Sequence, residues 1–172
     1  MERPVCSLIG YQPRYFSFKY DEHCLELEKM LPEQLKCFIK SGVKTIWVDV
    51  EIGIDLWAIS LILELKERYP KLQLEVTNLC IKKQNEYSQE CKNYYQYMLR
   101  KCGHSMVLVP ETIASHMSYH TIANINICDY LVAIYDDKSD NYVSLAIEYS
   151  LENSCNKPEY FTKLIIIISS KY

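Results

Sequence analysis

Short apolar runs rich in β-branched residues alternate with helix-like segments along almost the whole of this 172-residue chain. The pattern predicts strands over residues 5–9, 45–50, 73–76, 106–109, 130–135 and 164–168. It predicts helices between them, over residues 21–41, 54–69, 85–102, 113–126 and 142–154. Because parallel strands must be joined by crossovers, this alternation favours an α/β fold, a three-layer sandwich with a mostly parallel sheet of five to six strands. No linker or repeat interrupts the pattern, so we expect a single domain over residues 1–172.

Pro32 lies inside the first helical segment, and proline has no backbone N–H to donate within a helix. We therefore expect the helix over residues 21–41 to break or restart there. The run over residues 45–50 is apolar almost throughout, which indicates a strand that is covered on both faces.

The composition is that of an ordinary globular domain, with 49% hydrophobic residues, 24% charged residues and a net charge of −3. The slightly acidic balance argues against a protein that coats nucleic acid, since such proteins usually carry a basic surface. Only four glycines occur, whereas average usage would give about twelve. This scarcity excludes most glycine-rich phosphate-binding loops.

The N-terminal segment has no basic region followed by a long apolar stretch, so no signal peptide is predicted. The most apolar run, residues 164–168, is far shorter than the ~20 residues of a membrane span, and we expect a cytoplasmic protein without membrane contact. No two of the eight cysteines are closer than eleven residues, which excludes CxxC units for zinc or redox chemistry. We expect free thiols that behave as small buried hydrophobic residues.

Ligands of open parallel sheets bind beyond the carboxyl ends of the strands, where the strand order reverses. We therefore expect functional residues in segments 10–14, 49–55 and 136–144, which follow the first, second and fifth predicted strands. Asp49, Glu51 and Asp55 in the second segment could hold a metal or perform acid–base chemistry. They could equally form a solvated loop in which Asp55 stabilises a helix N-terminus.

His116 and His120 are four residues apart and would share a helix face, and Cys102 and His104 could complete a set of metal ligands. The spacing matches no common zinc module, so we predict no metal and no cofactor. Nothing in the sequence selects one cysteine and one histidine as a nucleophile and its base. We therefore predict no catalytic residue.

The turn Gly10-Tyr11-Gln12-Pro13 follows the first predicted strand, and residues 52–58 read Ile-Gly-Ile-Asp-Leu-Trp-Ala. These segments resemble the G-[YH]-R-P turn and the G-G-x-x-G-x-D-L-W-A loop of the YpsA-like family, a branch of the SLOG group of Rossmann-like domains. Residues 129–136 are similar to the family's fifth strand, and residues 146–149 to its last helix. The resemblance covers nearly the whole chain and implies a Rossmann-like fold and a ligand derived from a nucleotide.

The chain departs from the family at four elements of the ligand site. Residues 49–51, Asp-Val-Glu, replace a Gly-Gly pair, so carboxylates stand where backbone amides could hold a phosphate. Gln12 replaces an arginine, with Arg14 two residues on, while residues 142–144 replace Gly-Gly-Thr and residues 120–121 replace Arg-Asn. The resemblance thus implies a degenerate ligand site formed by Gly10, Tyr11, Gln12, Arg14, Asp49, Glu51, Gly53, Asp55, Tyr142 and Ser144. The P-G-G-x-G-T-x-x-E string of the related cytokinin-activating phosphoribohydrolases is absent.

Residues 82–101 combine five basic residues and four tyrosines with two acidic residues. Basic residues interleaved with aromatic ones can bind single-stranded nucleic acid by stacking over a charged groove. The same segment can form an amphipathic helix that packs its tyrosines on the sheet, or a contact surface for a protein. The candidate partner-binding residues are Lys82, Lys83, Tyr87, Lys92, Tyr94, Tyr95, Tyr97, Arg100 and Lys101.

The favoured hypothesis is a non-catalytic interaction protein on a degenerate YpsA-like scaffold, with a protein or ribonucleoprotein complex as its partner. One concrete form is an inhibitor of a host defence complex, of the anti-CRISPR type, carried by a phage or mobile element. The alternatives are a sensor of a nucleotide-derived small molecule and a nucleotide hydrolase with a new catalytic set. Under the favoured hypothesis nucleotides bind weakly or not at all, and direct contact with nucleic acid stays open.

Overall fold

A computed structural model describes residues 4–10, 22–50, 54–78, 88–102, 105–107, 119–135, 141–156 and 163–168. In these ranges the strands are β1 (Val5–Gly10), β2 (Thr45–Val50), β3 (Gln73–Asn78), β4 (Ser105–Val107), β5 (Tyr130–Tyr135) and β6 (Lys163–Ile168). The helices are α1 (Glu22–Lys40), α2 (Ile54–Arg68), α3 (Gln89–Cys102), α4 (Tyr119–Ile127) and α5 (Asn141–Asn156). Every strand and helix predicted from the sequence is present. Parts of four predicted elements, residue 21 and residues 85–87, 108–109 and 113–118, lie outside the described residues.

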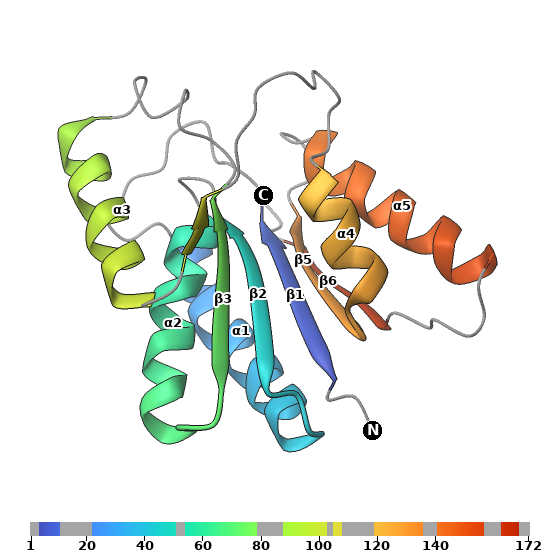
Figure 1. Ribbon diagram of the computed structural model, residues 1–172, viewed down its shortest axis with the longest axis horizontal. Helices are drawn as coiled ribbons and strands as arrows, with labels where there is room; N and C mark the ends of the chain where they lie inside the picture. The colour runs from blue at the N-terminus through green and yellow to red at the C-terminus, as the bar shows by residue number, and fades with distance from the viewer. Residues whose placement is uncertain are drawn as a thin grey trace.

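Within these ranges, all neighbouring strands are parallel, in the order β4-β3-β2-β1-β5-β6. The chain builds outward from β1 to β4, then crosses to the other side of β1 to add β5 and β6 (Figure 1). Helices α1, α2 and α3 lie on one face of the sheet, and α4 and α5 lie on the other. Right-handed crossovers require this split, because reversing the direction of strand addition moves the helices to the opposite face. The predicted Rossmann-like α/β sandwich is confirmed.

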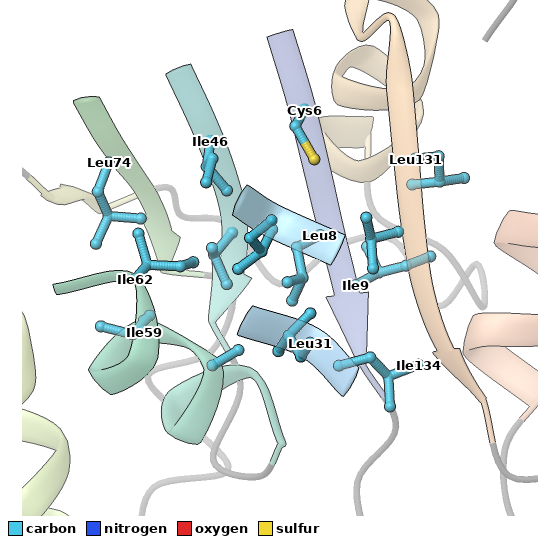
Figure 2. Packing of buried hydrophobic residues seen from close by; sticks show 14 of the residues in the cluster. Cys6, Leu8, Ile9, Leu31, Ile46, Ile59, Ile62, Leu74, Leu131 and Ile134 are labelled. Atoms are coloured by element: carbon cyan, nitrogen blue, oxygen red, sulfur yellow. The ribbon is translucent and has the colours of Figure 1, made fainter. Parts of the chain in front are cut away.

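Strand β1 is central in the sheet, and its residues 6–10 are buried. Leu8 is fully buried and pairs with Val48 of β2 on one side and with Val132 of β5 on the other. Figure 2 shows Leu31 of α1 near Leu8 and Ile62 of α2 near Leu74, all within one core cluster. A strand with neighbours on both edges and helices on both faces is expected to be largely apolar, and Ser7 is the one polar residue of Val5–Gly10.

Helix α1 continues through Pro32, so the prediction of a break or restart there was wrong. A proline inside a helix costs about 3 kcal/mol relative to alanine. Leu31, Leu35 and Phe38 of the same helix are buried, and the Phe38 ring lies 4.8 Å from the Tyr130 ring of β5. Because burying each large apolar side chain contributes about 1.5–3 kcal/mol, packing on the sheet outweighs the cost of the proline.

Helix α1 ends in a backbone motif that needs glycine. The N–H of Val43 donates to the carbonyl of Phe38 at 3.0 Å, and the N–H of Gly42 donates to the carbonyl of Ile39 at 3.1 Å. This pair of bonds is the Schellman motif, and Gly42 adopts the positive φ, 111°, that the motif requires. The chain then enters β2 directly, with its direction fixed by backbone hydrogen bonds.

The start of β1 is tied to the turn before β5, although 124 residues separate the two partners. The N–H of Asp129 donates to the carbonyl of Val5 at 2.8 Å, and the N–H of Val5 donates to the Asp129 carboxylate at 2.7 Å. These reciprocal bonds fix the register of β1 against β5, the pair at which the strand order reverses.

We expect Asp129→Ala to destabilise the protein by about 1–2 kcal/mol, because it removes a charged acceptor from the N–H of Val5. Urea unfolding followed by circular dichroism measures the loss. Asp129→Asn is the matched control, since it keeps a carbonyl oxygen and should lose less. Equal unfolding midpoints for the alanine variant and the parent would show that the bond does not stabilise the fold.

Candidate functional site

Of the segments that the sequence singled out, the parts that the structure describes lie at the carboxyl edge of the sheet (Figure 1, upper edge), namely Gly10, residues 49–50, residues 54–55 and residues 141–144. Gly10 ends β1 and pairs with Ile134, one residue before the end of β5. Because the strand order reverses between β1 and β5, the crevice expected for a ligand lies between the ends of these two strands. Helix α5 begins at Asn141, next along the chain after β5, and so starts at the same edge.

The structure places five of the ten ligand-site candidates along this edge. Gly10 is buried, and Ser144 is half-buried in the first turn of α5, where it has an interaction partner. The backbones of Asp49, Asp55 and Tyr142 lie near the end of β2 and in the first turns of α2 and α5. The other five candidates lie outside the described residues: Tyr11, Gln12, Arg14, Glu51 and Gly53.

The structure describes only some of the residues that were considered as metal ligands. Over the described part of the chain, no group of three or more His, Cys, Asp or Glu residues is arranged to hold a metal ion. His104 and His116 lie outside that part, His120 is placed only by its backbone in α4, and Thr121 beside it is fully buried. Cys102 is buried at the end of α3, where it packs in the core.

Among the cysteines whose side chains the structure describes, three are buried and have raised pKa values. Burial raises the pKa of Cys102 to about 11 and that of Cys128 to about 12. Burial, together with the nearby Cys128, raises the pKa of Cys6 still further. Because the thiolate is the nucleophilic form, these thiols are poor nucleophiles at neutral pH.

Cys37 corrects the expectation that the cysteines are buried, because it is an exposed free thiol on α1. The buried face of that helix runs through Leu31, Leu35 and Phe38, and the helical period turns position 37 toward solvent. The spacing of the cysteines in the sequence predicts free thiols. It does not predict on which face of a helix a given cysteine lies.

Helix α3 carries the partner-binding candidates that the structure describes. It begins after Ser88, whose carbonyl accepts the first helical hydrogen bond, from the N–H of Lys92 at 3.1 Å. Tyr95 and Met98 are buried at 2% and 3% exposure. Tyr95 therefore belongs to the core and is removed from the partner-binding candidates. Tyr94 is half-buried and packs against the same core.

The opposite side of the helix, here called the α3 outer face, consists of Asn93, Gln96, Tyr97, Arg100 and Lys101, all of which are exposed. Tyr97 is 53% exposed, and Nζ of Lys101 lies 5.6 Å from the centre of its ring. A cation at this distance over an aromatic ring is a favourable cation–π contact. Lys92 is half-buried beside this face, while Lys82, Lys83 and Tyr87 lie outside the described residues.

Sequence reasoning missed a pocket of about 320 Å³ at the opposite, amino edge of the sheet. The pocket lies where the connections from α1 to β2 and from α2 to β3 run side by side. Lys44, Arg68 and Lys71 line it together with apolar residues. The sequence feature that could have indicated this pocket is a basic residue at or soon after the end of each of two successive helices, Lys44 after α1 and Arg68 at the end of α2.

Comparison with known proteins decides the family. The sequence matches the YpsA family model, described as the YspA SLOG family, over residues 6–169. The chain belongs to the YpsA family. UPF0398 proteins of Bacillus thuringiensis (strain Al Hakam), Bacillus cereus (strain B4264) and Bacillus anthracis (strain A0248) are each 24% identical over 148 residues. Each match covers 84% of this chain and 80% of the relative.

The family assignment agrees with the resemblance seen in the turn after β1 and in the segment around Asp55-Leu56-Trp57-Ala58. The family assignment also agrees with the Rossmann-like parallel sheet found here. No helix in the described part of this YpsA-family chain is long and apolar enough to cross a membrane.

The raised pKa values predict a ranking of thiol reactivity. At pH 8, iodoacetamide should modify Cys37 at least about tenfold faster than Cys102 or Cys128 in the folded protein, because few of the buried thiols are ionised. Peptide mass spectrometry after timed quenching measures each site. Rates should converge in urea, which serves as the control, and equal rates in the folded protein would contradict the ranking.

Proposed function

We propose that this YpsA-family chain is a non-catalytic interaction protein whose α3 outer face binds another macromolecule. The observation that carries the proposal is the exposure of Tyr97, at 53%, beside the cationic group of Lys101. On the same helix, Tyr95 is buried in the core. A large aromatic side chain left in solvent next to cations is typical of the centre of a binding surface, where tyrosine and arginine are enriched.

Charge supports the same surface. Arg100 and Lys101 are exposed in the last turn of α3, whereas Glu90, the acidic residue of its first turn, lies at the other end. The protein as a whole has a net charge of −3. A cationic end on an acidic protein orients approach to an anionic partner and raises the association rate.

The carboxyl edge supports the non-catalytic part of the proposal. Asp49 and Glu51 stand where the family resemblance places a Gly-Gly turn, and their carboxylates would repel a phosphate. Cys6, Cys102 and Cys128 are buried with raised pKa values and offer no nucleophile. The chemistry of these residues favours binding over catalysis.

The partner proposed is a protein or a ribonucleoprotein complex. Tyr97 suits a protein surface, while Arg100 and Lys101 suit the phosphates of an RNA component, so a ribonucleoprotein could use both. An inhibitor of an RNA-guided defence complex, of the anti-CRISPR type and carried by a mobile element, is the specific form of this proposal that is worth testing first.

Nucleotides distinguish the proposal from its main alternative, a sensor of a nucleotide-derived molecule. We expect AMP, ADP-ribose and related nucleotides to bind with dissociation constants above about 10 μM, equivalent to about −7 kcal/mol, because carboxylates replace the amide-lined turn. Isothermal titration calorimetry with a nucleotide panel measures this. Tighter binding, or turnover of the nucleotide detected by chromatography, would favour the sensor or the hydrolase instead.

The α3 outer face is tested by a photo-crosslinking residue at Gln96, introduced in the cells that naturally carry this chain. We expect Tyr97→Ala to reduce the crosslinked partner by at least about tenfold if the partner surface is protein, since truncating a hot-spot side chain costs about 2 kcal/mol or more. If RNA is contacted, Arg100→Glu with Lys101→Glu should have the larger effect, and binding should fall steeply between about 50 and 200 mM salt.

Leu151→Ala on α5 is the matched control, because Leu151 is also a large apolar residue, 50% exposed, on a different helix. It should leave the crosslinked partner unchanged. The proposal fails if Tyr97→Ala and the double charge reversal both fold and crosslink as the parent does.

A further inference from the structure

The pocket at the amino edge has walls whose backbone is fixed. On one side the Schellman motif of α1 holds Val43, and on the other the N–H of Leu72 donates to the carbonyl of Tyr69 at 2.9 Å. The N–H of Gln73 then donates to the carbonyl of Lys44 at 2.7 Å and joins the two connections. A cavity built on such bonds is formed before any ligand arrives, which lowers the entropic cost of binding.

Apolar side chains form the base of the pocket. Val43 and Leu72 are buried at 1% and 4% exposure, and Ile39 is half-buried beside them. Tyr69 and Pro70 complete the apolar lining. At about 320 Å³ the volume lies at the small end of the range of ligand pockets, about 300–1,000 Å³, which suits a single large apolar side chain.

Three cationic residues line the pocket together with these apolar side chains. Arg68 and Lys71 are exposed and Lys44 is half-buried, and none of the lining residues is acidic. In the part of the chain that the structure describes, the ion pair found is Lys36 with Glu33, so these three cations have no carboxylate partner there. The exposed Glu67 lies one residue before Arg68 and does not line the pocket.

The helix dipole explains only one of the three cations. Arg68 is in the last turn of α2, where a positive charge is favourable. Lys44 and Lys71 lie in the connections beyond the helix ends, so no helical preference accounts for them. Their shared feature is the pocket that they line.

We propose that this pocket binds an acidic peptide segment of a protein partner, with one large apolar side chain in the cavity and carboxylates on both sides paired with Lys44, Arg68 and Lys71. An apolar cavity within a charged rim is the arrangement of a protein-binding hot spot. Lys44 comes from the connection between α1 and β2, whereas Arg68 and Lys71 come from the end of α2 and the connection after it. Cations from two separate chain segments match a peptide with charges on either side of its anchor better than they match one compact anion. The inference is independent of the α3 outer face.

The experiment uses the full chain and a fluorescein-labelled peptide in which one tryptophan is flanked on each side by three Asp or Glu residues. Fluorescence anisotropy at low salt should give saturable binding. The triple variant Lys44→Glu, Arg68→Glu, Lys71→Glu should bind at least about tenfold more weakly, because it reverses every charge on the rim. Replacing the tryptophan by glycine, or the acidic residues by Asn and Gln, should weaken binding similarly.

The matched control is Lys29→Glu, Lys36→Glu, Lys66→Glu, which changes the net charge by the same amount at residues that do not line the pocket. It should keep the parental affinity, and circular dichroism verifies that both triple variants are folded. Absence of saturable binding by the parent, or equal weakening by both triple variants, overturns the proposal. Indole-3-acetate that binds as tightly as the peptide would also overturn it, because the pocket would then be a site for a small apolar carboxylate.

Discussion

The pairing of β1 with both β2 and β5 is the constraint on which the rest of this structure depends. Residues 6–10 of β1 are buried, and the strand order reverses beside it, so β1 belongs to both halves of the sheet. The reciprocal bonds between Val5 and Asp129 hold that reversal in register at the amino end of the strand. Since a shift of one residue would turn every apolar side chain of β1 to the other face, the position of both helix layers follows from this register.

The alternation of strands and helices could be predicted from the sequence because it rests on local period and length, which the core then reinforces. Pro32 was misjudged because a local rule, the missing N–H, competes with a tertiary one, the burial of Leu31, Leu35 and Phe38. The resemblance to the YpsA family could be recognised for a related reason. The motifs that carry it lie at the junctions between strands and helices, and the same local periodicity gives the positions of these junctions along the chain.

Surface assignments were harder to predict than the fold. Tyr95 and Tyr97 look alike in the sequence, yet Tyr95 is buried and Tyr97 is 53% exposed. Their separation by two residues, about 200° around a helix, determines the difference once the buried face is known. The amino-edge pocket could not be inferred at all, because Lys44 and Lys71 are brought together only when β2 and β3 pair. Contacts between separate connections depend on strand order, which the periodicity does not contain.

The topology itself brings basic residues to the amino edge of the sheet. Helices α1, α2 and α3 each run back from the carboxyl edge, so all three end toward the amino edge, on one face of the sheet. Each has basic residues in its last turn, namely Lys40, then Lys66 and Arg68, then Arg100 and Lys101. A cation in that position is an ordinary response to the dipole of a single helix. Three parallel crossovers on one face bring these basic residues toward the same edge, and Lys44 and Lys71 join Arg68 in lining an apolar pocket there. The ends of α1 to α3 therefore lie on the side of the fold to which we assign the proposed acidic peptide, independently of the carboxyl edge.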